Sequence, residues 1–472
     1  MSAPSVFRGL EGRVHFMGVA GAGMVSLAEL LLRSGFDVSG CDLQPGPVAR
    51  SLESLGGVVL QGHDPSHLDG VALLVVTAAI PPDHPEIQRA RDMGIPVLKR
   101  AEALGQWVVR GTVVAVAGTH GKTTTTAMIT DILEEGGLAP TGFVGGRVSR
   151  WESNLRFGGG DLFVVEADEY DRSFLHLRPR IAVVTNLDAD HLDVYEDLGG
   201  VQEAFTRFLE QVDPQGRILV CGDDQGLSRL LPGLGSRVST YGLKPGAQLR
   251  AVDPVHGPEA SRFRVLEKGE EKGEITLSLP GEHNIANALG AAAAARALGV
   301  EWDVIAGALA RFQGVGRRFQ VVGEVRGITV VDDYAHHPTE IRATLAACRD
   351  RFPGRRLVAV FQPHLFSRTR DFAVQFGEAL AEADEVWISE IYPAREEPLE
   401  GVSGVMVVEA TLDAGAQHVF FHPELSELPR ELAETLTSGD VCITMGAGSI
   451  EHLAGDLLGL LRGRGRRKDV TA

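Results

Sequence analysis

The sequence predicts an α/β protein of three domains, each built on a parallel sheet covered by helices. Three observations lead to this prediction. The chain has 472 residues, which is more than one ordinary hydrophobic core holds and fits two or three domains. Short apolar runs typical of buried strands alternate with helical patterns along the chain. Glycine is abundant, with 57 residues and no collagen-like period, which indicates many tight strand-to-helix turns.

The first predicted domain covers residues 1–110, and its first strand begins at Arg13. The apolar run VHFMGV leads into the loop GAGM and the helical pattern SLAELLLRSG. The later runs FDVSGCD, VALLVVTAAI and IPVLK are typical of further strands. Because strands and helices alternate here, we expect the strands to be parallel.

The second and third predicted domains cover residues 111–315 and 316–472. In the second, the runs TVVAVAG, DLFVVEAD, RIAVVTNLD and GRILVCGDD predict strands. An alanine-rich helix is expected from Asn284 to Leu298, before the helix-stopping Gly299. The charged stretch 252–273 is expected to form a surface hairpin and loop. In the third domain, GITVVDDY, RRLVAVFQP, EVWISEIY and DVCITMGAG predict another alternating α/β fold.

Composition excludes several classes of protein. The formal net charge is -18, so a polyanion would be repelled over most of the surface and no nucleic-acid partner is expected. The basic stretch 462–468 is more simply explained as a solvated terminus than as a nucleic-acid arm. The sequence shows no signal peptide and no run long enough to span a membrane, so we expect a cytoplasmic protein without membrane insertion. The four cysteines form no CxxC pair, which fits a reducing compartment and gives no support for a zinc site.

The clearest chemical motif is AGTHGKTT at residues 117–124, where a strand meets a helix. Backbone N–H groups at such a turn can cradle phosphate oxygens, helped by the helix dipole. Lys122 supplies a positive charge for the β- and γ-phosphates, and Thr123 offers a hydroxyl to Mg²⁺. The match to the P-loop pattern is partial, because Val116 stands where the first glycine would fall. An ordinary strand-to-helix turn is the alternative.

Two further clusters follow the next predicted strands. Glu166 and Asp168 end the run DLFVVEAD and Glu169 follows it, and His191 lies among acidic residues after IAVVTN. Ligands gather beyond the carboxyl ends of parallel strands, and a carboxylate there can hold Mg²⁺. A solvated acidic loop explains the first cluster almost as well. A structural role for His191 is about as probable as a metal or phosphate role.

Polar groups also mark a helix start and the third domain. Asn284 and Asn287 share one face at the start of a predicted helix, where their amides suit a purine edge, although capping is the commoner role. The runs GRRF, DDYAHHP and FQPHLFSRTR open the third domain or follow its strands. We expect the last two runs to meet at one edge of the third sheet. Their Arg, His, Tyr and Asp side chains can bind carboxylates and phosphates, with surface ion pairs as the alternative.

The first domain carries a weaker glycine motif, GVAGAGM, at residues 18–24. Asp42 follows about twenty residues later, at the end of the second predicted strand. This arrangement is similar to a dinucleotide-binding fingerprint, except that Ala20 stands where glycine is expected. The motif predicts a cleft for a diphosphate and does not require a nicotinamide cofactor.

Taken in order, these motifs resemble the Mur ligase family. The resemblance extends from about Val14 to Ser449, and eight motifs in one order make it highly specific. Within the family, they are most similar to the members that join L-alanine to UDP-N-acetylmuramic acid. The phrases that carry it are GAGM with VSGCDL, AGTHGKTTTTAM, VEADEYDRSFLHLRP, TNLDADHLD, GEHNIANALGA, FQGVGRRFQ, DDYAHHPTEI and FQPHLFSRTRD.

The resemblance implies a Rossmann-like domain for the UDP part of the substrate, a central P-loop-type domain for ATP and Mg²⁺, and a C-terminal Rossmann-like domain. It implies that the sugar-nucleotide carboxylate takes the γ-phosphoryl group of ATP. The amine of L-alanine then attacks the acyl phosphate. This reaction belongs to peptidoglycan precursor synthesis, and we expect a monomer or homodimer.

By motif matching, the resemblance also implies roles for individual residues. Catalytic roles fall to Lys122, His191, His336 and Arg368. ATP binding falls to Gly118, Thr119, His120, Gly121, Lys122, Thr123, Thr124, Asn284, Asn287, Arg318 and Asp333. UDP-sugar binding falls to Gly21, Ala22, Gly23, Met24, Asp42 and Thr77. Amino-acid binding falls to Tyr334, His336, His364 and Arg368, and metal binding to Thr123, Glu166 and His191.

The chain departs from the family pattern at three positions. Ala20 replaces a common glycine, Tyr170 stands where many members carry Ser, and Leu365 stands where some carry Arg beside the amino-acid site. Four alternatives stay open. They are a murein tripeptide ligase of cell-wall recycling, a folate-type polyglutamate ligase, a nucleotide-dependent oxidoreductase and a non-catalytic UDP-sugar sensor.

Overall fold

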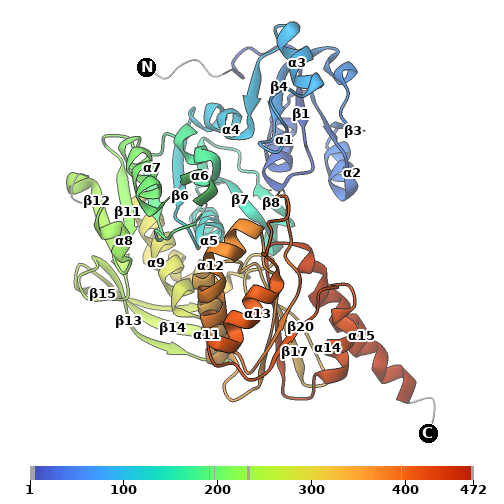
Figure 1. The fold of residues 1–472 in the computed structure, drawn as a ribbon. Helices are drawn as coiled ribbons and strands as arrows, with labels where there is room; N and C mark the ends of the chain where they lie inside the picture. The colour runs from blue at the N-terminus through green and yellow to red at the C-terminus, as the bar shows by residue number, and fades with distance from the viewer. Residues whose placement is uncertain (1–5, 191, 196, 231–233, 395, 469–472) are drawn as a thin grey trace. The chain divides into compact units, whose positions relative to one another are not determined.

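The computed structural model describes residues 6–190, 192–195, 197–230, 234–394 and 396–468 (Figure 1). The chain forms two compact units. The first comprises Met1–Asp253, Arg264–Ile275 and Ala286–Phe312, and the second comprises Pro254–Phe263, Thr276–Ile285 and Gln313–Ala472. Three separate sheets, of five, ten and six strands, organise these units.

The five-stranded sheet lies in the first unit and has the strand order β3-β2-β1-β4-β5. All its pairings are parallel. The order reverses between β1 and β4, which is where open α/β sheets bind ligands. The elements are β1 (Arg13–Met17), α1 (Ala22–Arg33), β2 (Val38–Asp42), α2 (Gly46–Ser54), β3 (Val58–Gln61), η1 (Pro65–Leu68), β4 (Val71–Val76), α3 (Pro85–Asp92), β5 (Val97–Lys99) and α4 (Arg100–Val108).

The ten-stranded sheet has the order β15-β14-β13-β12-β11-β10-β6-β9-β7-β8. Strand β6 is central, between β10 and β9, and pairs with both in parallel. The first part of this region contains β6 (Thr112–Ala117), α5 (Lys122–Glu135), β7 (Thr141–Val148), η2 (Ser149–Trp151), β8 (Ser153–Arg156), β9 (Leu162–Glu166), η3 (Tyr170–His176), β10 (Ile181–Val184), α6 (Leu192–Tyr195) and α7 (Leu198–Glu210). The second part contains β11 (Arg217–Cys221), α8 (Gln225–Ser228), η5 (Gly235–Arg237), β12 (Val238–Gly242), β13 (Leu249–His256), β14 (Ser261–Glu267), β15 (Glu270–Leu277), α9 (Glu282–Ala297) and α10 (Trp302–Arg311).

The six-stranded sheet of the second unit has the order β16-β17-β21-β18-β19-β20. Only β16 is antiparallel to its neighbour. Helices α11, α12 and α13 contribute to one buried apolar cluster, and α14 and α15 contribute to another. The elements are β16 (Gln320–Val325), β17 (Ile328–Asp333), α11 (Pro338–Arg351), β18 (Leu357–Phe361), α12 (Phe366–Leu380), β19 (Glu385–Ile388), α13 (Gly404–Asp413), β20 (Val419–Phe421), α14 (Leu428–Thr435), β21 (Val441–Met445), η6 (Ser449–His452) and α15 (Leu453–Lys468).

The predicted α/β class and its three sheets are confirmed. The predicted helix 284–298 corresponds to α9, which begins two residues earlier and ends one residue earlier. The expectation for 252–273 was incomplete, because β13, β14 and β15 extend the ten-stranded sheet there. Alternate residues of β14 are buried, as is typical of an antiparallel strand with one face in the core and one face in solvent. The charged side chains therefore occupy the solvent face of strands at one end of this sheet.

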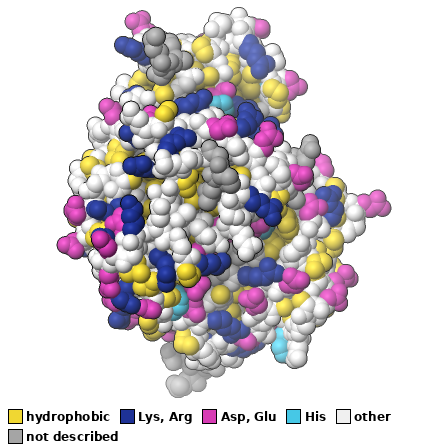
Figure 2. Space-filling model, turned by 90° about the vertical axis from the view of Figure 1, so that its left-hand side faces the viewer, with side chains coloured by type: hydrophobic (Ala, Val, Ile, Leu, Met, Phe, Trp, Pro, Cys, Tyr) yellow, Lys and Arg dark blue, Asp and Glu magenta, His cyan; other side chains and the backbone are white. Residues whose placement is uncertain are grey.

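Charge is mixed on the visible surface. Figure 2 shows Lys and Arg side chains interspersed with Asp and Glu over one face of the molecule. This distribution accompanies the net charge of -18. Within the described residues, no helix is both long and apolar enough to cross a lipid bilayer.

Candidate functional site

Two glycines with left-handed backbone angles shape the loop between β6 and α5. Gly118 has φ of +134° and Gly121, the N-cap of α5, has φ of +82°. A Cβ on Gly118 would lie 2.0 Å from Thr185 Oγ1, and a Cβ on Gly121 would lie 2.5 Å from Asn287 Oδ1. Both positions therefore need glycine. Because Gly121 has no side chain to cap α5, the first N–H groups of this helix are suited to an anionic ligand.

Residues that follow β10 hold this loop in place. Asn186 Oδ1 accepts a hydrogen bond from the His120 N–H at 2.8 Å, and Asn186 Nδ2 donates to the His120 carbonyl oxygen at 3.0 Å. The Thr185 hydroxyl donates to the same oxygen at 2.5 Å. The Asp188 N–H donates to Thr119 Oγ1 at 2.9 Å. The segment that follows the run IAVVTN thus lies against the AGTHGKTT loop, because β6 and β10 are neighbouring parallel strands.

Lys122, the first residue of α5, turns back over the loop. Its Nζ donates to the carbonyl oxygens of Gly118 at 2.7 Å and Thr119 at 3.0 Å, and it pairs with Glu169 at 2.8 Å. Burial disfavours the charge on Lys122, but Glu169 and Asp168 outweigh burial and raise its pKa. Burial raises the pKa of Glu169 to about 7, with Lys122 opposing. The ammonium is therefore held charged beside a carboxyl that gains a proton near neutrality.

Two of the three predicted metal ligands meet beside Lys122. The Thr123 hydroxyl donates to Glu166 Oε1 at 2.9 Å, and Glu166 Oε2 accepts from the Gly145 N–H at 2.5 Å. Hydroxyl and carboxylate oxygens are ligands that Mg²⁺ prefers, so the donor chemistry fits this ion. His191, the third predicted ligand, lies outside the described residues.

The two asparagines of α9 differ in their surroundings. Asn287 is the neighbour that leaves no room for a side chain at Gly121. Asn284 Nδ2 donates to the Pro280 carbonyl oxygen at 2.8 Å. In this bond the Asn284 amide is the donor, whereas in the capping role that the sequence left open a side-chain oxygen accepts a helix N–H.

The β1–α1 loop of the first sheet is closed by an acidic side chain. Gly18 has φ of +82°, and a Cβ there would lie 2.5 Å from Thr77 Cγ2, so Thr77 of the β4 end contacts this loop. Asp42 Oδ2 accepts from the Ala20 N–H at 3.0 Å, and Asp42 Oδ1 accepts from the Gln44 N–H at 2.9 Å. Because the loop uses the backbone of residue 20, alanine is tolerated there.

The predicted UDP-sugar residues fall on the start of α1 and beside a pocket. Helix α1 begins at Ala22, and its N-cap Gly21 has no side chain. A Cβ on Gly23 would lie 2.9 Å from Arg100 Cδ, so Arg100 lies over the first turn of α1. The Met24 side chain is buried, which leaves only its backbone for ligand contact. Thr77 lines a pocket of about 540 Å³, together with Ile80, Pro82, Ile95, Val97 and Lys99 among others.

Asp333, at the end of β17, braces the backbone of the second unit. Its buried carboxylate accepts from the Phe319 N–H at 2.6 Å and from the Ala335 N–H at 2.8 Å. Burial raises the pKa of Asp333 to about 6, while Arg318 opposes the shift. Arg318 also lies 3.6 Å from Glu340.

The runs that follow β17 and β18 meet at one edge of the third sheet, which confirms that expectation. The His336 and His364 rings are 6.0 Å apart, and the Tyr334 and His336 rings are 5.2 Å apart. His364 Nδ1 lies 3.3 Å from Arg368 Nη1. The Arg318 guanidinium lies 5.0 Å from the centre of the Tyr334 ring. Cationic, aromatic and imidazole groups therefore gather around one small region.

Three parts of the chain match domains of one protein family. Residues 13–111 match "Mur ligase family, catalytic domain", residues 116–295 match "Mur ligase middle domain" and residues 317–448 match "Mur ligase, glutamate ligase domain". The UDP-N-acetylmuramate–L-alanine ligase of Oleidesulfovibrio alaskensis is 45% identical over 93% of this chain and 96% of that protein. The ligase of the same name from Salinibacter ruber is 43% identical over 96% of each chain. The chain belongs to the Mur ligase family.

Solved Mur ligase structures share this fold. The UDP-N-acetylmuramate–alanine ligase of Thermotoga maritima has a TM-score of 0.82 and 29% identity, over 96% of this chain and 100% of that chain. A murein peptide ligase from Psychrobacter arcticus has a TM-score of 0.71 and 27% identity, over 96% and 99% of the two chains. The three sheets of this chain therefore form the three-domain Mur ligase architecture.

Several residues that shape the site of this Mur ligase had no individual role in the sequence analysis. Glu169 pairs with Lys122, and Asn186 and Thr185 hold the loop backbone. All three lie at strand ends, within or beside the motifs described above. Their position at a strand end could have marked them as candidate site residues, but the direction of each side chain depends on the neighbouring strand.

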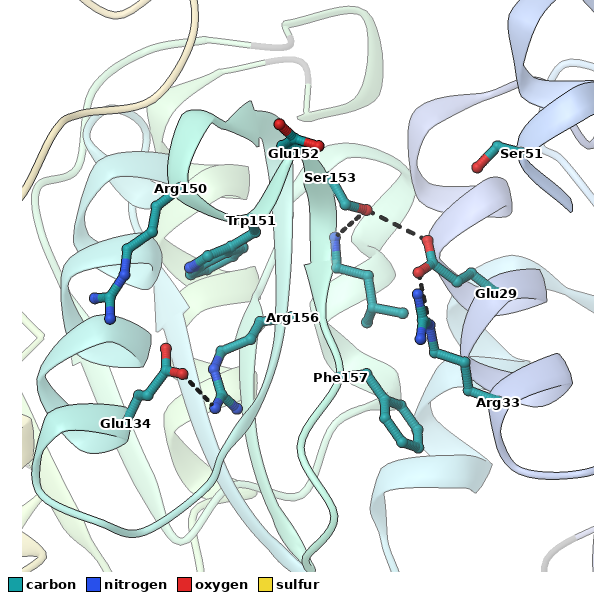
Figure 3. A pocket seen from close by; sticks show the side chains of 11 residues that line it. Glu29, Arg33, Ser51, Glu134, Arg150, Trp151, Glu152, Ser153, Arg156 and Phe157 are labelled. Carbon is teal, nitrogen blue, oxygen red and sulfur yellow. Dashed lines mark hydrogen bonds and ion pairs between the residues drawn. The ribbon is translucent and has the colours of Figure 1, made fainter. Parts of the chain in front are cut away.

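A second pocket in this Mur ligase is not the candidate site. It measures about 460 Å³ and is lined by residues of α1 and of the β8 region (Figure 3). Its ionic groups pair with one another, Arg33 with Glu29 and Arg156 with Glu134, each at 2.8 Å. None of the predicted site residues lines it, and four of its charged side chains are engaged in these two ion pairs.

Proposed function

We propose that this chain uses ATP to form the amide bond between the carboxyl group of UDP-N-acetylmuramic acid and the amino group of L-alanine. One observation carries the ATP-dependent part. The ends of β6, β9 and β10 bring Lys122, Glu166 and Asn186 together at the N-terminus of α5. The names of the full-length relatives at 43–45% identity support the two other substrates.

The β6–α5 loop provides the chemistry that a phosphoryl transfer needs. A carboxylate that approaches a triphosphate meets electrostatic repulsion, which cations must reduce. Lys122 lies at the helix start, where its ammonium can leave the carbonyl oxygens of Gly118 and Thr119 for phosphate oxygens. Thr123 and Glu166 would hold Mg²⁺, which supplies additional charge neutralisation when bound.

The reaction then proceeds in two balanced steps. An oxygen of the muramoyl carboxylate attacks the γ-phosphorus of ATP, and the bond to the β-phosphate oxygen breaks to release ADP. The free amine of L-alanine attacks the acyl carbon, loses a proton and expels inorganic phosphate. We assign the sugar nucleotide to the Gly21–Met24 turn, Asp42 and the pocket beside Thr77, since an uncapped helix start suits a diphosphate.

We assign L-alanine to the cluster in the second unit. Arg368 can pair with its carboxylate, and His364 lies 3.3 Å from the Arg368 guanidinium. Tyr334 and His336 complete the group around them. Because Leu365 contributes no charge, Arg368 carries the main electrostatic contact with the amino-acid carboxylate.

The test is phosphate release from ATP and Mg²⁺ with UDP-N-acetylmuramic acid, measured with and without L-alanine. The proposal expects release only when both substrates are present, together with a product whose mass equals the two substrates minus water. Turnover with a muropeptide in place of L-alanine, and none with L-alanine, would assign the chain to the recycling ligases instead. Binding of the sugar nucleotide without ATP consumption would support the sensor alternative.

A further inference from the structure

The first domain contains a buried group of metal-binding side chains that the proposed reaction does not use. His15 lies on β1, Cys41 on β2, His67 on η1 and Glu86 on α3. One potential ligand atom from each of them lies within 4.8 Å of every other. The side chains of His15, Cys41 and Glu86 are completely inaccessible to solvent. We propose that these four residues bind a divalent transition-metal ion of the zinc class.

The distances within this group are close to those of a tetrahedral site. His15 Nε2 lies 3.1 Å from Glu86 Oε1 and 3.4 Å from Cys41 Sγ. Cys41 Sγ lies 3.7 Å from Glu86 Oε1, and His67 Nδ1 lies 3.9 Å from that oxygen. Normal zinc bond lengths place two N or O ligands about 3.3 Å apart and a thiolate sulfur about 3.5 Å from either. These four distances are within about 0.6 Å of the tetrahedral values, and the remaining pairs of ligand atoms lie within 4.8 Å of each other.

The surrounding hydrogen bonds orient the ligands. Ser39 Oγ lies 2.7 Å from His15 Nδ1, so a hydrogen bond at Nδ1 leaves Nε2 to face the centre. His63 Nδ1 lies 3.0 Å from Cys41 Sγ, where it can donate to a metal-bound thiolate. Outer-shell partners of this kind fix ring orientation and tune ligand strength in metal sites.

The charges and the donor atoms of the four side chains also fit a divalent zinc-class ion. A buried glutamate and a thiol that must lose its proton on binding give two negative charges, which one divalent cation balances. His67 Nδ1 is buried and has no hydrogen-bond partner within the described part of the chain. Nitrogen and sulfur donors select zinc-class metals over Mg²⁺. Cysteine spacing could not indicate such a site, because the four residues lie on four separate elements.

The location of the site would give the ion a structural role beside the β1–α1 loop. The Cys41 carbonyl oxygen accepts hydrogen bonds from the N–H groups of Gly18 at 2.8 Å and Val19 at 3.1 Å. A metal on Cys41 would therefore tie the β1–α1 loop to η1 and α3. This inference does not depend on the proposed ligase reaction.

Cobalt binding tests the proposal on the full-length protein. Protein freed of metal with a chelator is titrated with Co²⁺ in excess Mg²⁺, which occupies the oxygen-rich ATP site. We expect one equivalent to bind with a thiolate-to-cobalt absorption in the near ultraviolet, and Zn²⁺ to displace it. Cys41→Ser should lose the absorption, and Cys221→Ser, a buried cysteine on β11, should keep it.

His67→Gln provides a second variant in case Cys41→Ser does not fold, since His67 lies at the edge of the cluster. It should weaken Co²⁺ binding by at least about tenfold while circular dichroism stays unchanged. Wild-type protein that binds no Co²⁺, or binds it without the thiolate absorption, would overturn the proposal. Unchanged Co²⁺ affinity in a folded His67→Gln variant would also overturn it.

Discussion

The β1–α1 and β6–α5 loops share one local design but are held by side chains of opposite charge. Each connects a parallel strand to a helix whose N-cap is a glycine, Gly21 in the first and Gly121 in the second. Each contains a glycine with positive φ that a neighbouring strand end crowds. In the first loop, the Asp42 carboxylate accepts a backbone N–H. In the second, Lys122 donates to two backbone carbonyl oxygens.

This difference shows that loop shape and loop chemistry are determined separately. The glycines set the backbone path in both loops, because a Cβ would collide in each. The charge at the helix start then decides what the loop can bind. The Lys122 ammonium at the start of α5 suits a reacting triphosphate. At the start of α1, the Asp42 carboxylate of β2 holds the loop backbone and Arg100 lies over the first helical turn, which suits a diphosphate that is held without reaction.

The largest effect is expected for Lys122→Ala, which removes the cation that distinguishes the two loops. We expect phosphate release to fall by about a thousandfold or more, as is typical when a phosphate-binding charge is lost. UDP-N-acetylmuramic acid binding, measured by calorimetry, should stay nearly unchanged. Lys272→Ala, at a half-buried lysine of β15 that pairs with Glu270, is the matched control. Full turnover in Lys122→Ala would show that the second loop does not bind ATP.

Gly121→Ala should have the next largest effect. The substitution combines φ of +82° with a Cβ only 2.5 Å from Asn287 Oδ1, which costs about 1–3 kcal/mol. We expect ATP affinity to fall roughly tenfold to a hundredfold. Gly137→Ala is the control, because φ is +76° there but nothing lies within 4 Å of the added Cβ. Gly18→Ala, in the β1–α1 loop, should weaken sugar-nucleotide binding and leave ATP affinity unchanged. If either glycine variant weakened both ligands equally, the assignment of one ligand to each loop would be wrong.

The pair of Lys122 and Glu169 beside the β6–α5 loop predicts a pH-dependent stability. The folded pKa of Glu169, about 7, is raised from an ordinary value of 4.5. Its contribution to stability is therefore complete below pH 4.5 and is lost as the pH rises through about 7. Between pH 5 and pH 8, the free energy of unfolding in urea should fall more for the wild type than for Glu169→Gln. Glu270→Gln, at an exposed carboxylate, should behave as the wild type; equal slopes in all three proteins would contradict the prediction.

Asp42→Asn should give the smallest effect. The amide oxygen can still accept one of the two N–H groups that Asp42 now binds, and the loss of the other is worth about 0.5–1.5 kcal/mol. We expect affinity for UDP-N-acetylmuramic acid to fall by about twofold to tenfold, with ATP affinity unchanged. Glu53→Gln on α2 is a control of equal charge change. A loss greater than a hundredfold would show that Asp42 contributes more than its two hydrogen bonds to the loop backbone.

Much of the fold and part of the site could be predicted from local patterns. The alternation of apolar runs with helical segments gave the three sheets, and GKT at a strand end located the start of α5. Proximity of the strand-end motifs followed from one rule about parallel sheets. The strands of the stretch 252–273 were harder to predict from the sequence. They are defined by their pairing partners and by burial on one side more than by their own composition.

The α/β class, the glycine turns and the residue types at each strand end follow from the amino-acid sequence, since they depend on contacts within a few residues. Which side chains meet depends on the folded arrangement of the strands. Lys122 and Glu169 are 47 residues apart in the chain, and the His15, Cys41, His67 and Glu86 cluster draws on four elements of the first domain. Such contacts depend on strand order and side-chain direction, which no local spacing specifies.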